Sequence, residues 1–400
     1  MITSKFQDKT LSLLGFGTMR LPLAKDGSID EAQVAEMTDY ALKQGVNYFD
    51  TAYPYHDGKS EVVMGKVLNQ YPRDSWYLAT KYPGHQISSS YDPAAIFEEQ
   101  LKKCGVDYFD FYLLHNVYEN SMDVYLDPKW GILDYFKEQK RLGRIKHLGF
   151  SSHGRAETLK AFLDICGDDM EFCQIQLNYL DWTLQDAKAK YELLTERNIP
   201  VWVMEPLRGG KLAALEGDAA VKLQAAAQAA GAPGRTDAEW SFRFLQSLPN
   251  VKMVLSGMSN LTQMQQNIAT FEARAPLSDA ERSALLDVAE GLKKGVPCTA
   301  CRYCTAGCPM ELDIPLLLSV YNDVLYAPSL INVIGLEALP DEKRPAACIG
   351  CGKCAKICPQ SIDIPGALKN FAEILSKMPT WAEISRQREE AAKRNAAAAK

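Results

Sequence analysis

The sequence predicts an α/β protein in which a (β/α)8 barrel is followed by a small, mainly helical domain. Its length of 400 residues suits two domains better than one. Over the first 290 residues, short apolar segments alternate with amphipathic ones, as in a barrel. Eight of the eleven cysteines lie between residues 298 and 358, which sets the last part of the chain apart.

The eight strand candidates are short and almost continuously apolar, as is typical of parallel strands that are covered on both faces. They span residues 13–18, 46–52, 76–82, 107–115, 147–151, 173–178, 200–206 and 251–257. The helical segments span residues 30–44, 59–70, 93–104, 130–142, 155–166, 185–197, 237–247 and 260–270. A doubly wound sheet is the alternative, but no G-x-G-x-x-G follows the first strand. Residues 5–14 are expected to form a hairpin before the barrel.

The domain boundary is expected near residue 290. Residues 278–294 have a helical pattern, and the segment GVPC then leads into the second domain. We therefore expect a barrel over 1–290 and the small domain over 291–382. The tail, 383–400, is charged and rich in alanine, and is interpreted as a solvated or frayed helix.

The cysteines of the second domain form two runs with the same spacing, C-x2-C-x2-C-x3-C, each followed by proline. The runs are Cys298, Cys301, Cys304 and Cys308, then Cys348, Cys351, Cys354 and Cys358. This is the bacterial ferredoxin spacing for two [4Fe–4S] clusters, in which the fourth cysteine of a run ligates the other cluster. Zinc ribbons use paired C-x2-C units, and a disulfide framework is unusual for a cytosolic chain of this size. The spacing therefore predicts two [4Fe–4S] clusters.

The two runs belong to an internal repeat with a period of 50 residues. Residues 298–318 match residues 348–368, and the match includes the segment Asp-Ile-Pro at 313–315 and at 363–365. Pro315 is well placed in the first turn of a helix that continues over IPLLLSVYNDVLY. The arrangement resembles the helical dicluster ferredoxin domains of respiratory enzymes more than the small ferredoxins built from two hairpins.

Composition excludes several other classes of protein. The formal net charge is −6 and no basic block stands out, so a nucleic-acid partner is not expected. The longest apolar runs, 111–114 and 199–204, are far too short for a membrane span. The first ten residues lack a basic region followed by an apolar stretch, so a cytoplasmic location is expected.

Four side chains that carry chemistry lie at the ends of three consecutive strand candidates. Asp50 ends the second strand, Tyr55 follows five residues later, Lys81 ends the third strand, and His115 ends the fourth. In a barrel these ends meet on the face where reactive groups gather. A lysine inside an apolar strand also needs a partner. The other four histidines are interpreted as residues of loops or of the polar surface.

On these motifs, residues 1–290 resemble an aldo/keto reductase. The resemblance is carried by FDTAYPY, ATKY, DYFDFYLLH, GFSS, QLNY and MEPLRGGKL. It implies a catalytic tetrad of Asp50, Tyr55, Lys81 and His115. A nicotinamide donates hydride to a carbonyl carbon, and Tyr55 gives the oxygen its proton. Lys81, held by Asp50, is expected to lower the pKa of Tyr55, and His115 to orient the carbonyl.

The resemblance also implies the contacts of an NAD(P)H cofactor. Its nicotinamide, pyrophosphate and adenine are expected against Ser151, Ser152, Gln176, Met204, Leu207, Arg208, Gly209, Gly210 and Asn267. Met204 replaces the aromatic residue that usually stacks on nicotinamide. Gly257 and Gln263 stand where NADP enzymes carry the cations that bind the 2′-phosphate. The sequence therefore weakly favours NADH.

The whole chain resembles bacterial and archaeal aldo/keto reductases that are fused to a dicluster domain. The first hypothesis is an oxidoreductase for a small carbonyl or alcohol whose clusters exchange electrons with a redox protein. An electron-transfer subunit with the barrel as a docking module, or a reductase with structural clusters, are the alternatives. Nicotinamide moves two electrons and a [4Fe–4S] cluster moves one, so a flavin would be a useful intermediary, but the sequence shows no flavin motif.

Overall fold

A computed structural model describes residues 1–86, 90–118, 121–292, 295–326, 333, 336–337, 339–380, 383 and 386. The chain divides into two compact units, Met1–Gly291 and Leu292–Lys400. The expected helix of the tail, 383–400, lies outside the described residues apart from 383 and 386.

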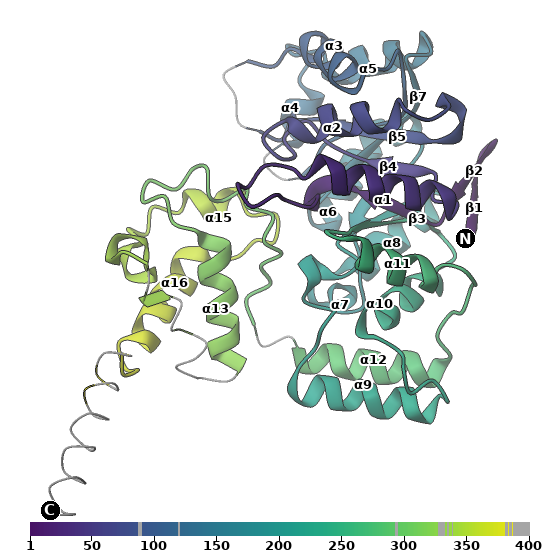
Figure 1. Ribbon diagram of the computed structural model, residues 1–400. Helices are drawn as coiled ribbons and strands as arrows, with labels where there is room; N and C mark the ends of the chain where they lie inside the picture. Colours follow the sequence, from purple (N-terminus) through teal and green to yellow (C-terminus); the bar gives the residue numbers. More distant parts are fainter. Residues whose placement is uncertain are drawn as a thin grey trace, which may run out of the picture. The chain divides into compact units, whose positions relative to one another are not determined.

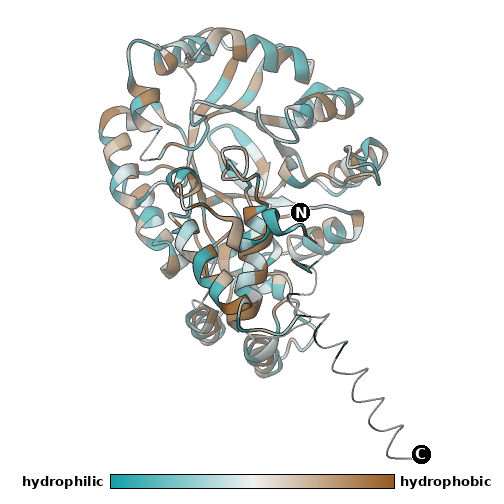
Figure 2. Cartoon of the chain, turned by 90° about the vertical axis from the view of Figure 1, so that its left-hand side faces the viewer, coloured by the Kyte–Doolittle hydropathy of each residue, from teal (hydrophilic) through white to brown (hydrophobic). Residues whose placement is uncertain are grey.

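The first unit is a closed barrel of eight parallel strands in the order β10-β3-β4-β5-β6-β7-β8-β9, surrounded by helices (Figures 1 and 2). The strands are β3 (Leu14–Gly17), β4 (Tyr48–Asp50), β5 (Tyr77–Tyr82), β6 (Phe109–Leu114), β7 (Ile145–Ser152), β8 (Cys173–Gln176), β9 (Val201–Met204) and β10 (Val251–Gly257). All eight lie within the predicted strands except for one or two residues at the ends of β7. Closure through β10 and β3 confirms the barrel and rules out the doubly wound sheet.

The helices of this unit follow the predicted pattern. They are α1 (Glu31–Lys43), α2 (Lys59–Leu68), α3 (Pro93–Cys104), α4 (Met122–Leu126), α5 (Ile132–Arg141), α6 (Ala156–Cys166), α7 (Asp181–Leu184), α8 (Ala187–Glu196), α9 (Gly217–Ala229), α10 (Asp237–Gln246), α11 (Leu261–Thr270) and α12 (Asp279–Leu292). Helix α9 was not predicted, because its alanine-rich sequence buries only three residues and gives a weak apolar stripe. Each helix of the described chain is too short or too polar to span a bilayer.

Short polar side chains determine where several of these helices begin. Asp30, Asp92, Thr236 and Asn260 each accept a hydrogen bond from a backbone N–H in the first turn of the helix that follows. Such caps satisfy donors that have no partner within the helix. The caps therefore fix the lengths of the loops that join strands to helices on the carboxyl face of the barrel.

A hairpin of β1 (Thr3–Phe6) and β2 (Lys9–Ser12) precedes the barrel, as predicted (Figure 1). Phe6 is 3% exposed and packs against Trp202 and Phe111 of the barrel interior, with ring centroids 5.0 and 5.7 Å apart. Phe6 and Leu11 of the hairpin thus share one hydrophobic core with the barrel interior. The side chains that carry chemistry lie elsewhere, at the carboxyl ends of the strands.

Glu171 joins the hairpin to the barrel. Burial alone would raise its pKa, but hydrogen bonds from His147, Lys140, Gln7 and the backbone N–H of Leu148 outweigh burial and lower the pKa to about 2. A carboxyl group whose pKa is lower in the folded state stabilises the fold above its unfolded value of 4.5. This contribution is lost as the pH falls from 4.5 towards 2.

We therefore expect Glu171→Gln to lower the free energy of unfolding by about 1–3 kcal/mol at neutral pH. The difference from the parent protein should shrink as the pH approaches 2. Denaturant unfolding of both proteins at several pH values measures this difference in the free energy of unfolding. Asp168→Asn, at an exposed position nearby, is the matched control and should change stability by less than about 0.5 kcal/mol. An equal difference at all pH values would contradict this role of Glu171.

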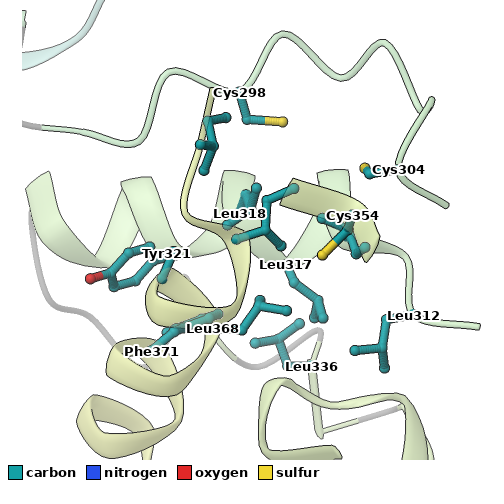
Figure 3. Packing of buried hydrophobic residues seen from close by; sticks show 14 of the residues in the cluster. Cys298, Cys304, Leu312, Leu317, Leu318, Tyr321, Leu336, Cys354, Leu368 and Phe371 are labelled. Carbon is teal, nitrogen blue, oxygen red and sulfur yellow. The ribbon is translucent and has the colours of Figure 1, made fainter. Parts of the chain in front are cut away.

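The second unit contains α13 (Ile314–Tyr326), α15 (Lys353–Ile357) and α16 (Ile364–Leu375) around its own core (Figure 3). The internal repeat is visible in it. Asp313 and Asp363 cap α13 and α16 through Oδ1, at 3.3 and 3.1 Å. Tyr321 and Phe371, equivalent in the repeat, contact each other with ring centroids 5.2 Å apart. Equivalent residues in mutual contact indicate a pseudo-twofold arrangement of the two halves.

Candidate functional site

The four predicted catalytic residues meet at the carboxyl ends of β4, β5 and β6. The ammonium Nζ of Lys81 donates hydrogen bonds to Oδ1 of Asp50 at 2.5 Å and to the carbonyl of Thr51 at 2.7 Å. It lies 4.9 Å from the ring centroid of Tyr55, whose ring meets that of His115 edge-on at 5.9 Å. The barrel thus brings together all four residues that the sequence singled out.

The ion pair between Asp50 and Lys81 is almost completely buried, with side chains 4% and 1% exposed. Burial raises the pKa of Asp50 and lowers that of Lys81, while their mutual attraction opposes both shifts. Removing one partner of such a pair leaves a buried charge, which costs about 3–5 kcal/mol. The pair therefore fixes Lys81 beneath the ring of Tyr55.

The expected effect of Lys81 on Tyr55 is not observed. Burial, together with the carboxylates of Asp50 and Glu205, raises the pKa of Tyr55 well above 10, and only Arg20 opposes this shift. The ammonium of Lys81 contacts the ring face, and its hydrogen bonds go to Asp50 and to a backbone carbonyl. In this state Tyr55 is a neutral phenol that holds its proton at physiological pH.

Glu205 is a functional candidate that the sequence analysis missed. It follows β9 with a positive φ of 56°, and its Oε1 lies 3.3 Å from Nη2 of Arg20. Its Oε2 is buried and has no hydrogen-bond partner among the described residues. A glutamate directly after an apolar strand was the available signal. Its carboxylate acts electrostatically on Tyr55.

Three histidines lie close together at the site: His85, His115 and His153. His85 contacts His115 with ring centroids 4.4 Å apart, and His153 interacts electrostatically with both. Burial is the main cause that lowers the pKa of all three, to about 4 for His85 and about 3 for His153. His85 lies in the loop after β5, one of the two settings predicted for it, and is 5% exposed there. His147, also 5% exposed, lies in β7, so its assignment to a loop or to the polar surface was wrong.

A buried carboxyl network supports the strand that carries Lys81. Glu61 of α2 accepts hydrogen bonds from Thr80 at 2.6 Å and from Gln100 at 2.7 Å. Gln100 also donates to the carbonyl of Lys81 and accepts from the hydroxyl of Tyr112. Burial raises the pKa of Glu61. These hydrogen bonds join β5 to α2 and α3 beside the ion pair of Asp50 and Lys81.

The residues expected near the nicotinamide lie at the ends of β7, β8 and β9. The hydroxyl of Ser151 accepts from the backbone N–H of Asn116 at 2.8 Å, and that of Ser152 donates to the carbonyl of Val117 at 2.7 Å. The amide of Gln176 donates to Asp181 at 2.7 Å. The two serine hydrogen bonds hold the loop after β6 against β7. Met204 is half-buried at the end of β9.

The loop expected near the pyrophosphate contains Leu207, Arg208 and two glycines. Nε of Arg208 donates to Asp181 at 3.1 Å, but its buried Nη2 has no hydrogen-bond partner among the described residues. Gly209 and Gly210 adopt positive φ values of 67° and 93°, which glycine tolerates without strain. A guanidinium N–H without an acceptor, beside a turn of glycines, fits a phosphate group.

The residues after β10 were assigned to the adenosine end of the cofactor. Gly257 packs against the side chain of Arg20, and Gln263 accepts from the backbone N–H of Ser259 at 2.8 Å. Asn267 is 6% exposed and donates to Ser256 at 3.1 Å. The three residues therefore lie at the same end of the barrel, and neither Gly257 nor Gln263 provides a cation.

The eight cysteines of the second unit line two cavities. Each cavity takes three cysteines from one run and the fourth from the other. The first is lined by Cys308, Cys348, Cys351 and Cys354, and the second by Cys298, Cys301, Cys304 and Cys358. Cys298, Cys304 and Cys354 lie along one edge of the leucine-rich core (Figure 3). The crossed arrangement is the one that the spacing predicted.

The chemistry of these cavities fits a polynuclear cluster. Burial raises the pKa of Cys304, and the nearby Cys301, Cys298 and Cys358 raise it further. A positively charged group between the sulfurs would favour their thiolate forms. No three ligands converge on one ion in the described chain. Thiolates that each bind a different iron of a cubane stand further apart than that.

Comparison with known proteins agrees with this geometry. The sequence profile of the aldo/keto reductase family matches residues 13–290, which is more than half of the chain. The chain belongs to the aldo/keto reductase family. A second profile, the 4Fe-4S dicluster domain, matches residues 297–362 of this aldo/keto reductase.

Individual relatives cover the barrel. "Uncharacterized oxidoreductase YqkF" of Bacillus subtilis is 28% identical over 307 residues, 70% of this chain and 92% of that protein. "NADH-specific methylglyoxal reductase" of Escherichia coli is 26% identical, over 51% of this chain and 66% of its own length. "Probable aldo-keto reductase 1" of Glycine max is 28% identical, over 50% of this chain and 57% of its own length. The matches thus span less than two thirds of the latter two relatives.

Solved structures give the same fold for the barrel. Aldo-keto reductase AKR11C1 from Bacillus halodurans, in its holo form, has a TM-score of 0.58 and 26% sequence identity. The alignment covers 72% of this chain and 95% of the bacillar protein. The chain thus has the barrel of this family, followed by a domain that matches the 4Fe-4S dicluster profile.

Proposed function

We propose that this aldo/keto reductase reduces an aldehyde or ketone with NAD(P)H, or oxidises the corresponding alcohol. The observation that carries the proposal is the convergence of Lys81 Nζ, Asp50, the Tyr55 ring and the His115 ring at the carboxyl ends of three adjacent strands. A nicotinamide supplies hydride to the carbonyl carbon. The residues of the chain then have to position the carbonyl oxygen and give it a proton.

Tyr55 is the proton donor in this mechanism. Because burial and nearby carboxylates keep its pKa high, its hydroxyl holds the proton until the oxygen of the substrate gains negative charge. Lys81 lies under the ring, and its cation–π contact helps to position the phenol. Asp50 keeps that ammonium in place, and neutral His115 orients the carbonyl.

The cofactor would be held by residues at the ends of β7 to β10. The free Nη2 of Arg208 and the turn of Gly209 and Gly210 support a pyrophosphate there. Without a cation at Gly257 or Gln263, we favour NADH over NADPH. The names of the relatives leave this open, since one is called NADH-specific and another NADPH-dependent.

We further propose that the two clusters exchange electrons with a redox protein. Two crossed four-cysteine cavities within one core support a pair of neighbouring clusters, which suits an electron relay. Clusters that only stabilise the domain are the second possibility. No described residue pattern supports a flavin.

Hydride chemistry at the barrel is tested by isotope transfer. The anaerobic protein is incubated with an aldehyde and with NADH whose nicotinamide is deuterated at C4. The alcohol product is then examined by mass spectrometry. Direct transfer should place one deuterium on the carbinol carbon. Electrons that travelled singly through clusters would lose the label to solvent. Turnover without deuterium in the product, or no turnover, would contradict the proposal.

The pH dependence provides a second check. Burial, His85, Lys81 and His153 lower the pKa of His115 well below 6.5, so this imidazole is neutral across the physiological range. We expect kcat/KM for carbonyl reduction to show no inflection from His115 between about pH 6 and about pH 8. An inflection in that range that disappears in His115→Gln would contradict the neutral role.

A further inference from the structure

The two cysteine cavities are equivalent in the repeat but differ in how far they reach the surface. At three equivalent rim positions the first cavity is the more exposed, and the difference is largest for Ile349, which is 62% exposed while Thr299 is 2% exposed. The pairs are Pro309 and Pro359, Ile349 and Thr299, and Cys351 and Cys301. Pro309 and Cys351 are exposed, whereas Pro359 is buried and Cys301 is half-buried.

The same comparison shows a difference in charge. Around the exposed cavity the helix α15 carries Lys353 and Lys356, and both are exposed. The equivalent positions of the other run hold Tyr303 and Ala306. The cation of that run, Arg302, is exposed but is paired with Asp313 at 2.9 Å. Lys353 forms no ion pair within the described part of the chain, so its charge faces solvent uncompensated. The exposed cavity is therefore bordered by an apolar residue and two cations in a protein whose formal net charge is −6.

We propose that the patch formed by Pro309, Ile349, Cys351, Lys353 and Lys356 is the docking surface for a small acidic one-electron protein. The inference rests on the proposed exchange of electrons. One electron passes from the partner, which is oxidised, to the four-iron group held by Cys308, Cys348, Cys351 and Cys354, which is reduced. No bond is made or broken and no proton moves. The other cysteine site has the more buried rim at the three positions compared above.

The chemistry of the patch suits this partner. Contacts between electron-transfer proteins are small, and complementary charge contributes more to their rate of encounter than to their stability. Two lysines at the rim attract an acidic surface, and Ile349 provides apolar contact at the point where Cys351 is exposed.

The test uses the full-length protein with its clusters and a reduced, acidic [2Fe–2S] ferredoxin as the probe. Stopped-flow absorbance at low and high salt gives the second-order rate of cluster reduction. Added salt should slow the reaction. Lys356→Ala and Ile349→Ser should each lower the rate about three- to tenfold at low salt. Iron content and midpoint potentials from an EPR titration should stay unchanged.

Ala306→Glu is the matched control, since it changes the charge by the same amount at the equivalent position of the other run. It should leave the rate unchanged. Three results would overturn the docking patch: a rate that rises with salt, an equal slowing by Ala306→Glu, or a midpoint potential that shifts with the rate. If the ferredoxin fails to reduce clusters that dithionite reduces, the electron exchange itself is refuted, and the patch with it.

Discussion

Tyr55→Phe should abolish carbonyl reduction, lowering kcat/KM by about 10³-fold while the fold and the clusters are retained. The phenol is the group at the meeting point of β4, β5 and β6 that can give the substrate oxygen a proton. General acid catalysis by a positioned side chain is worth about 10²–10⁴-fold, so its loss dominates other effects. Anaerobic oxidation of NADH and NADPH with a panel of aldehydes measures the change.

The substitution tests proton donation by itself, because the hydroxyl of Tyr55 has little other role in the structure. Oη of Tyr55 accepts and donates no hydrogen bond within the described chain. A phenylalanine ring keeps the edge-on contact with His115 and the cation–π contact with Lys81. By contrast, replacing Lys81 would leave Asp50 as a buried, unpaired carboxylate and would confuse stability with catalysis.

Tyr53→Phe provides the matched control two residues away. The hydroxyl of Tyr53 donates to Glu99 at 3.1 Å on the surface, away from the carbonyl site. Its loss should change kcat/KM by less than about twofold. If Tyr55→Phe retained full activity, or if both variants lost it equally, the assignment of Tyr55 as the acid would be wrong.

The tetrad was predictable because its members lie at the ends of consecutive strands. Parallel strands bring their carboxyl ends to one face of a barrel, so the positions of Asp50, Lys81 and His115 followed once the strands were recognised. The direction of the pKa shift of Tyr55 did not follow from the sequence. It depends on Glu205, which approaches from β9 on the far side of the barrel. Only the closed barrel brings those two residues together.

Glu205, in the loop after β9, escaped prediction for a related reason. Its positive φ of 56° turns its side chain in a direction that periodicity does not encode. For Arg208, which was expected at a pyrophosphate, Nε donates to Asp181 while Nη2 remains available. His85 lies in a loop, one of its two predicted settings, but its packing against His115 is set by tertiary structure and could not be predicted.

The cysteine sites show the opposite case, in which spacing alone predicted the arrangement. A C-x2-C-x2-C unit surrounds one cavity, and three further residues carry the fourth sulfur to the other cavity. The repeat supplies the second half, since Asp313 and Asp363 start equivalent helices that pack through Tyr321 and Phe371. Local sequence was sufficient because three ligands of each site lie within a few residues of one another, and the repeat supplies the fourth.

Crossed ligation makes a sharp prediction for pairs of substitutions. Cys308 and Cys351 line the same cavity, so Cys308→Ala with Cys351→Ala should remove one cluster and leave about four of about eight irons. Cys308→Ala with Cys301→Ala removes one ligand from each cavity and should remove both clusters. If each run held its own cluster, these two outcomes would be exchanged, because Cys301 and Cys308 belong to one run.

Iron analysis and EPR of the reduced proteins read out the result, and Cys166→Ala, a buried cysteine of the barrel, should keep all the iron. Because each cluster would tie both halves of the repeat together, losing both should also unfold the second unit. Its core is built from residues of both halves, so neither half can keep its apolar residues buried alone. The barrel has a separate core, so carbonyl reduction should survive in the double variant that keeps one cluster.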